Sequence, residues 1–262
     1  MGTIGIIGLG VVGGAIQQAF QDNHLINVYD INGRGNFSDA ASSDYIFICV
    51  PTNSTEEGDL DVSIVNGVCN DLMMSESEGI VIVKSTLQKG TMTSLESTHP
   101  SLKFVYMPEF LRDRDAVEWF ANPDRIVISG TKPVVDLVLD LFDWVPESTP
   151  KLVMTHEEAE VAKLAHNAFI ATKVTFTSEI ERICKQLDLD PFTVMQVVWT
   201  DRRLSGSDHL VPMSRGFGGK CVPKDTVALR KLDGHHDDLS LLAQVLKLGM
   251  ETNLQEQGDG SG

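Results

Sequence analysis

The sequence has no long apolar run, no excess of basic residues and no cysteines at the short spacings of a metal site. None of the apolar runs in its 262 residues reaches the ~20 residues that a membrane-spanning helix needs, and no basic segment precedes an apolar one at the N-terminus. We therefore expect a cytoplasmic protein without membrane segments. The formal net charge of -16 would repel a phosphate backbone, so we also expect no nucleic-acid partner.

The four cysteines give a second exclusion and one positive signal. Their positions do not match the spacing of zinc ligands, so we expect no metal site. Cys49 lies in an apolar run and Cys184 in a helical pattern, which predicts buried, inert thiols. Cys221 differs from them, because it follows three glycines in the stretch GFGGKCVPKD at residues 216–225.

The surroundings of Cys221 favour chemistry over packing. Pro223 and Asp225 suit the start of a helix, so the thiol would lie at a helix N-terminus with Lys220 and Lys224 beside it. A helix N-terminus and nearby lysines favour the thiolate, which makes Cys221 a candidate nucleophile. Asp225 could orient or deprotonate a water. The alternative is a structural glycine loop without chemistry.

Strand and helix patterns alternate through the first part of the chain. Apolar runs typical of strands occur at residues 3–9, 25–30, 44–50, 79–86, 102–110, 124–130 and 151–155, with helical patterns at 14–20, 61–74 and 131–143. This alternation predicts an α/β fold with a doubly wound, mostly parallel sheet of the Rossmann type. Ligands of such sheets bind beyond the carboxyl ends of the strands, where Thr52, Thr86 and Glu109 would face one crevice.

The first predicted strand leads into a dinucleotide-binding fingerprint. Gly8, Gly10 and Gly13 have its spacing, and Asp30 follows at the end of the second strand. Asp30 would accept hydrogen bonds from the ribose hydroxyls of the cofactor and repel a 2′-phosphate. We therefore expect NAD rather than NADP as the cofactor.

The pattern becomes helical from residue 157 onward. The longest helical segment, at residues 157–187, has no glycine or proline, and shorter ones follow at residues 191–199, 226–232 and 239–255. We expect an NAD-binding domain at residues 1–150 and an all-helical domain at residues 151–262. Because the long helix has more apolar surface than a small domain buries, we also expect a homodimer.

Glu160, Lys163 and Asn167 share one face of the long predicted helix. A lysine and an asparagine one turn apart can hold a substrate hydroxyl or a water. Without other information, a solvated polar stripe is the alternative explanation. Together with an NAD site and a cysteine nucleophile, however, these residues suit oxidation of an alcohol to an aldehyde and then, through a thioester, to an acid.

The stretch GFGGKCVPKD resembles the cysteine signature of the UDP-glucose/GDP-mannose dehydrogenase family. Other blocks resemble the family in the same order, namely IGIIGLGVVG, ICVPTN with GDLDVS, VKSTLQKGT, MPEFLRDRDAVEWFANPDRIVISG and EAEVAKLAHNAFIATKVTFTSEI. The resemblance implies an NAD-dependent, four-electron oxidation of a nucleotide sugar such as UDP-glucose to its uronic acid.

The resemblance also implies roles for individual residues. The catalytic ones are Cys221 as nucleophile, Asp225 and Thr86 with the catalytic water, Lys163 and Asn167 at the reacting oxygen of the sugar, and Glu109 as the active-site glutamate. The cofactor would contact Gly8, Gly10, Val11, Val12, Gly13, Asp30, Val50, Pro51, Thr52, Thr86 and Lys224. The substrate would contact Glu109, Phe110, Leu111, Arg112, Lys163, Asn167, Arg203, Phe217, Gly218 and Cys221.

The sequence departs from the family in three respects. It ends after the helical domain, where relatives continue into a second α/β domain that binds the nucleotide, so a separate UDP-binding chain is a conceivable partner. The segment between Asp30 and the ICVPTN block is short, and Asp113 stands where the family has a glutamate. Two alternatives stay open. One is a β-hydroxyacid dehydrogenase of the 6-phosphogluconate type, which needs no cysteine, and the other is a catalytically inactive NAD-binding protein.

Overall fold

The computed structural model describes residues 2–204, 217, 221–232 and 243–249. The chain forms two compact units, one of residues 1–55 and 60–163 and the other of residues 56–59 and 164–262. The division lies inside the long helix α7 (His156–Gln186), later than the boundary expected near residue 150. The reason is that β8 (Lys151–Met154) follows that expected boundary and still pairs with the sheet of the first unit.

The first unit is built on an eight-stranded sheet in the order β3-β2-β1-β4-β5-β6-β7-β8. Its remaining strands are β1 (Thr3–Ile7), β2 (Leu25–Asp30), β3 (Arg34–Gly35), β4 (Tyr45–Ile48), β5 (Ile80–Val83), β6 (Lys103–Tyr106) and β7 (Ile126–Gly130). Strands β2, β1, β4, β5 and β6, which are neighbours in this order, run parallel. β3 is antiparallel to β2, β7 is antiparallel to β6, and β8 is parallel to β7. The predicted Rossmann-type sheet is confirmed.

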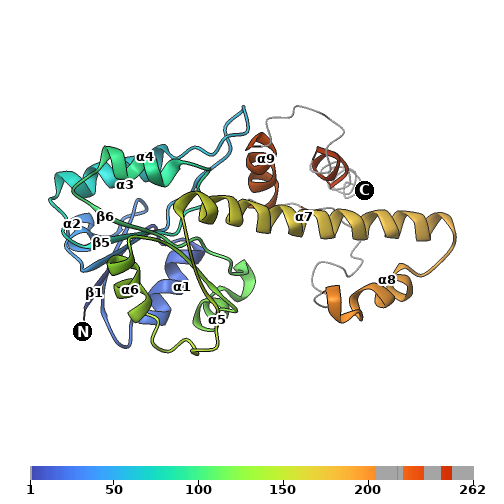
Figure 1. Cartoon of the computed structure of the whole chain (residues 1–262), viewed down its shortest axis with the longest axis horizontal. Coiled ribbons are helices and arrows are strands. Elements are labelled where there is room, and N and C mark those ends of the chain that lie inside the picture. Colours follow the sequence, from blue (N-terminus) through green and yellow to red (C-terminus); the bar gives the residue numbers. More distant parts are fainter. Residues whose placement is uncertain (1, 205–216, 218–220, 233–242, 250–262) are drawn as a thin grey trace. The chain divides into compact units, whose positions relative to one another are not determined.

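Helices cover both faces of this sheet (Figure 1). They are α1 (Val11–Phe20), α2 (Phe37–Ala41), α3 (Ser63–Met74), α4 (Thr91–Thr98), α5 (Ala116–Ala121) and α6 (Lys132–Asp140), with a short 3-10 turn at Asp113–Asp115. Alternate side chains of one strand enter opposite cores: Ile82 packs with residues of α1, α5 and α6, whereas Val83 packs with residues of α2, α3 and α4. This double burial explains why the strands appear in the sequence as continuous apolar runs.

The second unit is helical in the part that the structure describes. It contains most of α7, followed by α8 (Pro191–Trp199), a 3-10 turn at Arg202–Leu204, α9 (Val222–Leu232) and a helical segment at residues 243–249. The predicted helices at residues 157–187 and 191–199 are confirmed. Helix α9 begins at Val222, so Pro223 lies in its first turn, where the sequence predicted it.

Candidate active site

The glycine turn between β1 and α1 has the shape that a bound pyrophosphate requires. Gly8 has a positive φ of 96°, and a Cβ at Gly13 would lie 2.0 Å from the Gly8 carbonyl oxygen, so neither position accepts a side chain. At Gly10, by contrast, a Cβ would meet no protein atom within 4 Å. The space over Gly10 is therefore open to a ligand, and α1 begins at the next residue with its amides directed there. The predicted cofactor residues fit NAD at this turn.

Asp30 lies at the end of β2 and is joined to the glycine turn. Its Oδ2 accepts a hydrogen bond from the Leu9 amide at 2.7 Å, and its Oδ1 accepts one from the Asn32 amide at 2.9 Å. The hydrogen bonds from the Asn32 and Leu9 amides hold the pKa of Asp30 below its ordinary value, with a smaller contribution from the charge of Arg34. Asp30 is therefore ionised at neutral pH. An ionised carboxylate can accept the hydrogen bonds that ribose hydroxyls would donate.

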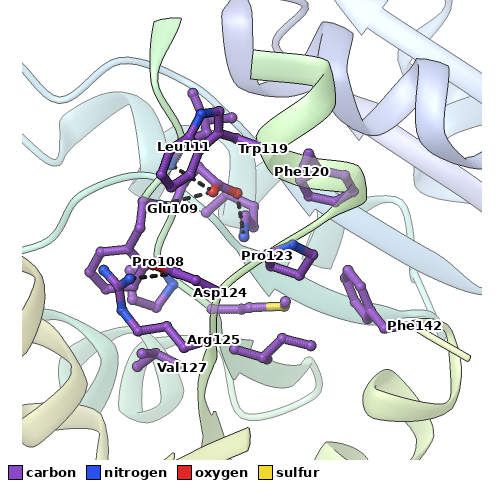
Figure 2. A pocket seen from close by; sticks show the side chains of 14 residues that line it. Pro108, Glu109, Leu111, Trp119, Phe120, Pro123, Asp124, Arg125, Val127 and Phe142 are labelled. Atoms are coloured by element: carbon purple, nitrogen blue, oxygen red, sulfur yellow. Dashed lines mark hydrogen bonds and ion pairs between the residues drawn. The ribbon is translucent and has the colours of Figure 1, made fainter. Parts of the chain in front are cut away.

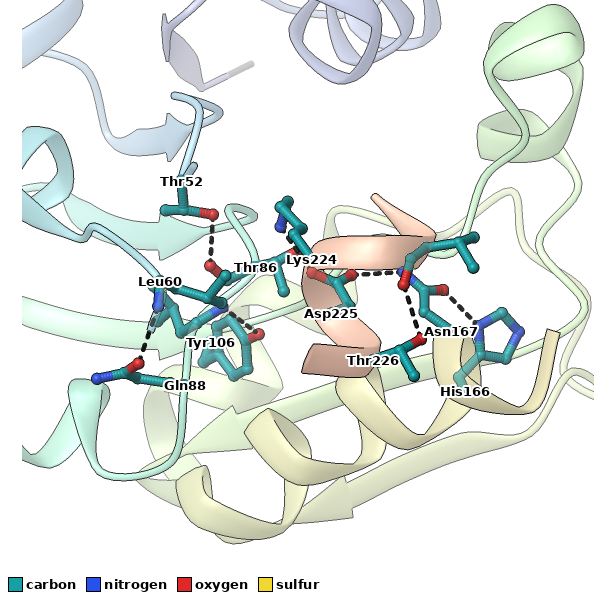
Figure 3. Close-up of polar contacts among 12 residues, drawn as sticks. Thr52, Leu60, Thr86, Gln88, Tyr106, His166, Asn167, Lys224, Asp225 and Thr226 are labelled. Carbon is teal, nitrogen blue, oxygen red and sulfur yellow. Dashed lines mark hydrogen bonds and ion pairs between the residues drawn. The ribbon is translucent and has the colours of Figure 1, made fainter. Parts of the chain in front are cut away.

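The loops that follow β4 and β5 lie side by side at the carboxyl edge of the sheet. The Thr52 hydroxyl donates to the Thr86 carbonyl at 2.7 Å (Figure 3), and the Ser85 hydroxyl donates to the Val50 carbonyl at 2.6 Å. The structure thus brings together Thr52 and Thr86, two of the three residues predicted at this edge of the sheet, with Val50 beside them.

Glu109, in the loop after β6, is held by a buried lysine that we did not predict. Lys84 Nζ lies 2.9 Å from Glu109 Oε2, and the two side chains are only 2% and 17% exposed. Glu109 Oε1 accepts hydrogen bonds from the Phe110 and Leu111 amides at 2.8 and 3.0 Å (Figure 2). Burial by itself would raise the pKa of Glu109, but the charge of Lys84 and these hydrogen bonds outweigh burial and lower it.

The signal for Lys84 was present in the sequence. It is the polar residue that directly follows an apolar strand, in the same block as Thr86. Its partner Glu109 lies at the end of the neighbouring strand, and only the pairing of β5 with β6 places them together.

Lys84 and Glu109 are among the residues that line a cavity of about 30 Å3, which Figure 2 shows with Glu109 labelled. Its lining includes Trp119, Phe120 and Phe142. Because pockets for small molecules span roughly 300–1,000 Å3, this cavity is too small for a sugar. The low exposure of both side chains, 2% and 17%, strengthens the attraction between the two charges.

Cations flank the predicted substrate loop at residues 109–112. The ring of Phe110 lies 4.4 Å from the Arg125 guanidinium and 5.1 Å from the Lys163 ammonium. The guanidinium of Arg112 lies 4.9 Å from the ring of Trp119. Each contact is within the range of a cation–π interaction, so the aromatic rings help to position Lys163 and Arg112.

Glu160 fixes the first turns of α7 to the first unit. Its carboxylate is fully buried and accepts hydrogen bonds from the Gly90 and Met92 amides at 2.6 and 2.8 Å. These amides belong to the N-terminus of α4, whose own cap residue Gly90 has no side chain. Burial raises the pKa of Glu160 despite both hydrogen bonds. Glu160 therefore ties α7, which carries Lys163, to the loop that carries Thr86.

In the second unit, Cys221 is the cap residue at the N-terminus of α9. The Asp225 amide donates to the Cys221 carbonyl at 3.0 Å, which is the first hydrogen bond of that helix. The Cys221 side chain is exposed, unlike the buried Cys69 and Cys184 and the half-buried Cys49. Burial raises the pKa of Cys49 and of Cys69 to about 12, so both thiols are inert at neutral pH.

Four residues after Cys221, Asp225 of α9 is part of a buried polar network that includes residues of α7. Asp225 has no exposed surface, and its two oxygens accept hydrogen bonds from Asn167 Nδ2 at 2.5 Å and from Lys224 Nζ at 2.6 Å (Figure 3). Asn167 Oδ1 also lies 3.0 Å from His166 Nδ1. The fold thus brings Asn167 to Lys224 and Asp225, two other predicted site residues, across 58 positions of the sequence. Their catalytic and cofactor roles stay predictions.

The other predicted residues of this unit are placed only in part. Phe217 is buried and packs against Ala171, Val245 and Leu246, so its contact with substrate stays a prediction. Gly218, Lys220 and the side chain of Arg203 lie outside the described residues. Among the described residues, no three His, Cys, Asp or Glu side chains are grouped as metal ligands. No helix in the described ranges is long and apolar enough to span a bilayer.

Two models of one protein family match most of the chain. The NAD binding domain of the UDP-glucose/GDP-mannose dehydrogenase family matches residues 34–142, and the central domain of the same family matches residues 157–255. The chain belongs to the UDP-glucose/GDP-mannose dehydrogenase family. This membership confirms the predicted resemblance and the predicted cofactor, NAD. Its binding at the glycine turn stays a prediction.

Curated and structural relatives agree with this family. UDP-glucose 6-dehydrogenase of Rhizobium meliloti (strain 1021) is 33% identical over 235 residues, which cover 82% of this chain and 53% of that protein. The chain therefore spans about half the length of this relative. A structure of a UDP-glucose dehydrogenase from the archaeon Pyrobaculum islandicum has a TM-score of 0.82 and 27% identity, and the match covers 97% of this chain and 68% of that chain.

The fold by itself does not separate the family from β-hydroxyacid dehydrogenases. Mycobacterium tuberculosis 3-hydroxyisobutyrate dehydrogenase matches with a TM-score of 0.72 but only 14% identity, over 96% of this chain and 93% of that chain. At this identity the match shows a common fold alone. The family assignment rests instead on the two domain models and on the curated relatives.

Proposed function

We propose that this chain carries out the NAD-dependent, four-electron oxidation of the primary alcohol of a nucleotide sugar such as UDP-glucose. The observation that carries the proposal is the exposed Cys221 thiol at the cap of α9, in a family whose NAD binding domain matches the first unit. A helix N-terminus favours the thiolate form of such a residue. The NAD site by itself would support only a two-electron oxidation.

The proposed reaction balances as two oxidations and one hydrolysis. The alcohol loses a hydride and a proton to become an aldehyde, to which the Cys221 sulfur adds to form a thiohemiacetal. Loss of a second hydride and proton leaves a thioester, and water releases the acid and regenerates the thiol. Bound NAD supplies the hydride acceptor in both oxidations, so each sugar consumes two NAD molecules and one water.

The chain's own residues would hold the reacting atoms and move protons. Lys163 and Asn167 would hold the reacting oxygen of the sugar and stabilise negative charge on it. Thr86 and Asp225 would position the water that attacks the thioester. Glu109, ionised and held by Lys84, would place a negative charge in the predicted substrate loop at residues 109–112.

The stoichiometry of the reaction tests this proposal. With NAD in excess, we expect two NADH for each sugar consumed, with UDP-glucose, a UDP-N-acetyl sugar or GDP-mannose as the substrate. One NADH from a β-hydroxyacid and none from any sugar would contradict the proposal in favour of the other dehydrogenase class. No NADH from any sugar, with NAD binding verified by calorimetry, would contradict it for this chain alone. The activity would then need a separate UDP-binding chain or be lost.

We also propose that the second unit forms a homodimer through α7. Phe169, Phe176 and Ile183 recur every seven residues and are 61%, 48% and 42% exposed, which makes one apolar face on this helix. Sedimentation at micromolar concentration should give twice the mass of the chain. Phe176→Glu should shift the protein to the monomer, whereas Lys185→Glu, at an exposed polar position of the same helix, should not. A monomeric wild type would overturn the dimer.

A further inference from the structure

The segment between β4 and α3 forms a hairpin whose two ends belong to different units. Ser54 and Leu60 form an antiparallel bridge at its base. The Leu60 amide donates to Gln88 Oε1 at 3.0 Å, in the loop that follows β5 (Figure 3). The base therefore belongs to the first unit, whereas residues 56–59 at the tip belong to the second. We call this segment the 54–60 hairpin.

The tip of the 54–60 hairpin packs against α9. Gly58 is buried with a positive φ of 84°, and a Cβ there would lie 2.6 Å from Val227 Cγ1. The backbone at Gly58 thus comes closer to α9 than any residue with a side chain would allow. Beside it, Asp59 Oδ2 lies 2.7 Å from Lys231 Nζ. Val227 and Lys231 are four residues apart, so the tip contacts one face of α9 through packing and through an ion pair.

Helix α7 holds α9 at a different face. Asp225 precedes Val227 by two residues, which at 3.6 residues per turn places the two side chains about 200° apart around the helix. The Asp225 carboxylate accepts its hydrogen bond from Asn167 of α7. The 54–60 hairpin and α7 therefore hold α9 from two sides. Because Cys221 is the cap of this helix, the place of its thiol depends on both contacts.

The proposed reaction gives these contacts a use. The chain passes from one unit to the other within α7 and again at the 54–60 hairpin. In the proposed reaction, the sugar stays bound to the Cys221 sulfur while NADH leaves the first unit and is replaced by NAD. The thiol must keep its place through this exchange, because a misplacement of about 1 Å can lower a rate by ~100-fold. Two connections restrict the movement of α9 more than α7 does by itself.

We propose that Gly58 and Asp59 are positioning residues, through which the 54–60 hairpin holds α9 and the Cys221 thiol in the reactive place. They act through Val227 and Lys231 and need no contact with sugar or cofactor. The proposal rests on the proposed function for its effect on acid formation. Its effect on the thiol can be measured without any sugar.

A Gly58→Ala variant tests the packing contact. It should lower the rate of acid formation at saturating sugar and NAD by about 10-fold or more, because the added Cβ displaces α9. NADH binding, followed by fluorescence, should stay within about 3-fold of the wild type, since the glycine turn lies in the first unit. Gly58→Ala/Val227→Ala removes the Cγ1 atom that the new Cβ meets, and it should recover at least ~3-fold of the lost rate.

Gly33→Ala is the matched control for backbone strain. Gly33 has a φ of 82°, close to that of Gly58, but a Cβ there would meet no atom within 4 Å. The control variant therefore has the same unfavourable backbone conformation without a new contact. Its rate of acid formation should stay within about 3-fold of the wild type.

Alkylation of Cys221 by iodoacetamide, followed by mass spectrometry of its peptide, reports on the thiol directly. A helix N-terminus favours the thiolate, so displacement of α9 in Gly58→Ala should move the midpoint of the pH profile upward. Gly33→Ala should keep the wild-type midpoint. If Gly58→Ala does not fold, Asp59→Lys tests the partly exposed ion pair and should slow acid formation by about 3-fold. Asp59→Lys/Lys231→Asp should restore the rate.

Three outcomes would overturn the proposal. One is a folded Gly58→Ala protein with the wild-type rate and the wild-type alkylation profile. Another is a loss of rate that Val227→Ala does not recover, since the cause would then be the backbone at residue 58 and not its contact with α9. The third is a charge exchange that leaves Asp59→Lys uncorrected. If the wild type forms no acid, the proposed function fails, and the alkylation profiles still decide whether the hairpin positions the thiol.

Discussion

A Cys221→Ser variant should form no uronic acid, with a rate at least ~1,000-fold below that of the wild type, while binding NAD unchanged. The size of the effect follows from the chemistry, because without a thioester the second oxidation has no covalent intermediate. A serine hydroxyl has a far higher pKa than a thiol and remains protonated at the cap of α9. Acid formation can be followed by chromatography of the sugar nucleotide, and NAD binding by calorimetry.

The matched control is Cys184→Ala, which removes a buried thiol from the same unit. It should leave acid formation intact apart from an effect on stability. The variant at Cys221 should still release the first NADH if the initial alcohol oxidation does not use the thiol. Acid production by Cys221→Ser at the wild-type rate would exclude the thioester route, even if the chain proved to be an active dehydrogenase.

Lys84→Met should lower the free energy of unfolding by about 3–5 kcal/mol, because it leaves the Glu109 charge buried without its partner. The three groups that would then hold Glu109 are the Phe110 and Leu111 amides and the more distant Lys163. Denaturant unfolding followed by tryptophan fluorescence reports on this unit, since Trp119 lines the cavity around the ion pair.

Two comparisons isolate the ion pair from a general effect of losing a lysine. Lys132→Met removes a lysine that is 84% exposed and paired with Asp136, so it should change stability by less than ~1 kcal/mol. Lys84→Met/Glu109→Gln should recover most of the loss, because no unpaired charge remains. If the double variant were as unstable as Lys84→Met, the loss would come from packing rather than from charge.

The pH dependence of stability gives the same pair a separate signature. The pKa of Glu109 in the folded protein is below its ordinary value of 4.5, so its stabilising contribution is present above that value. This contribution is lost as the pH falls from 4.5 through the lower folded pKa. In Lys84→Met the lowering charge is gone, and acidification should then relieve the buried carboxylate and reduce the difference from the wild type.

Local patterns determined much of this protein. The apolar runs of β1, β4 and β5 were recognisable as strands because both faces of each strand are buried, and α7 because its periodicity extends over 31 residues. The glycine turn was recognisable because Gly8 and Gly13 have no room for side chains. The position of Cys221 at a helix cap followed from Pro223 and the glycines beside it. The short helices α2, α4 and α5 were not predicted, since segments such as TMTSLEST have little apolar periodicity.

Only the tertiary structure decided which polar groups pair. Lys84 and Glu109 are 25 positions apart, Glu160 reaches the start of α4 across about 70, and Asn167 reaches Asp225 across 58. Arg34 lies opposite Asp30 only because the two-residue strand β3 pairs with β2. Backbone periodicity is a local property and is visible in the sequence. The pairing of buried charges depends on which loops the sheet brings to one edge, and that is set by the packing of the whole unit.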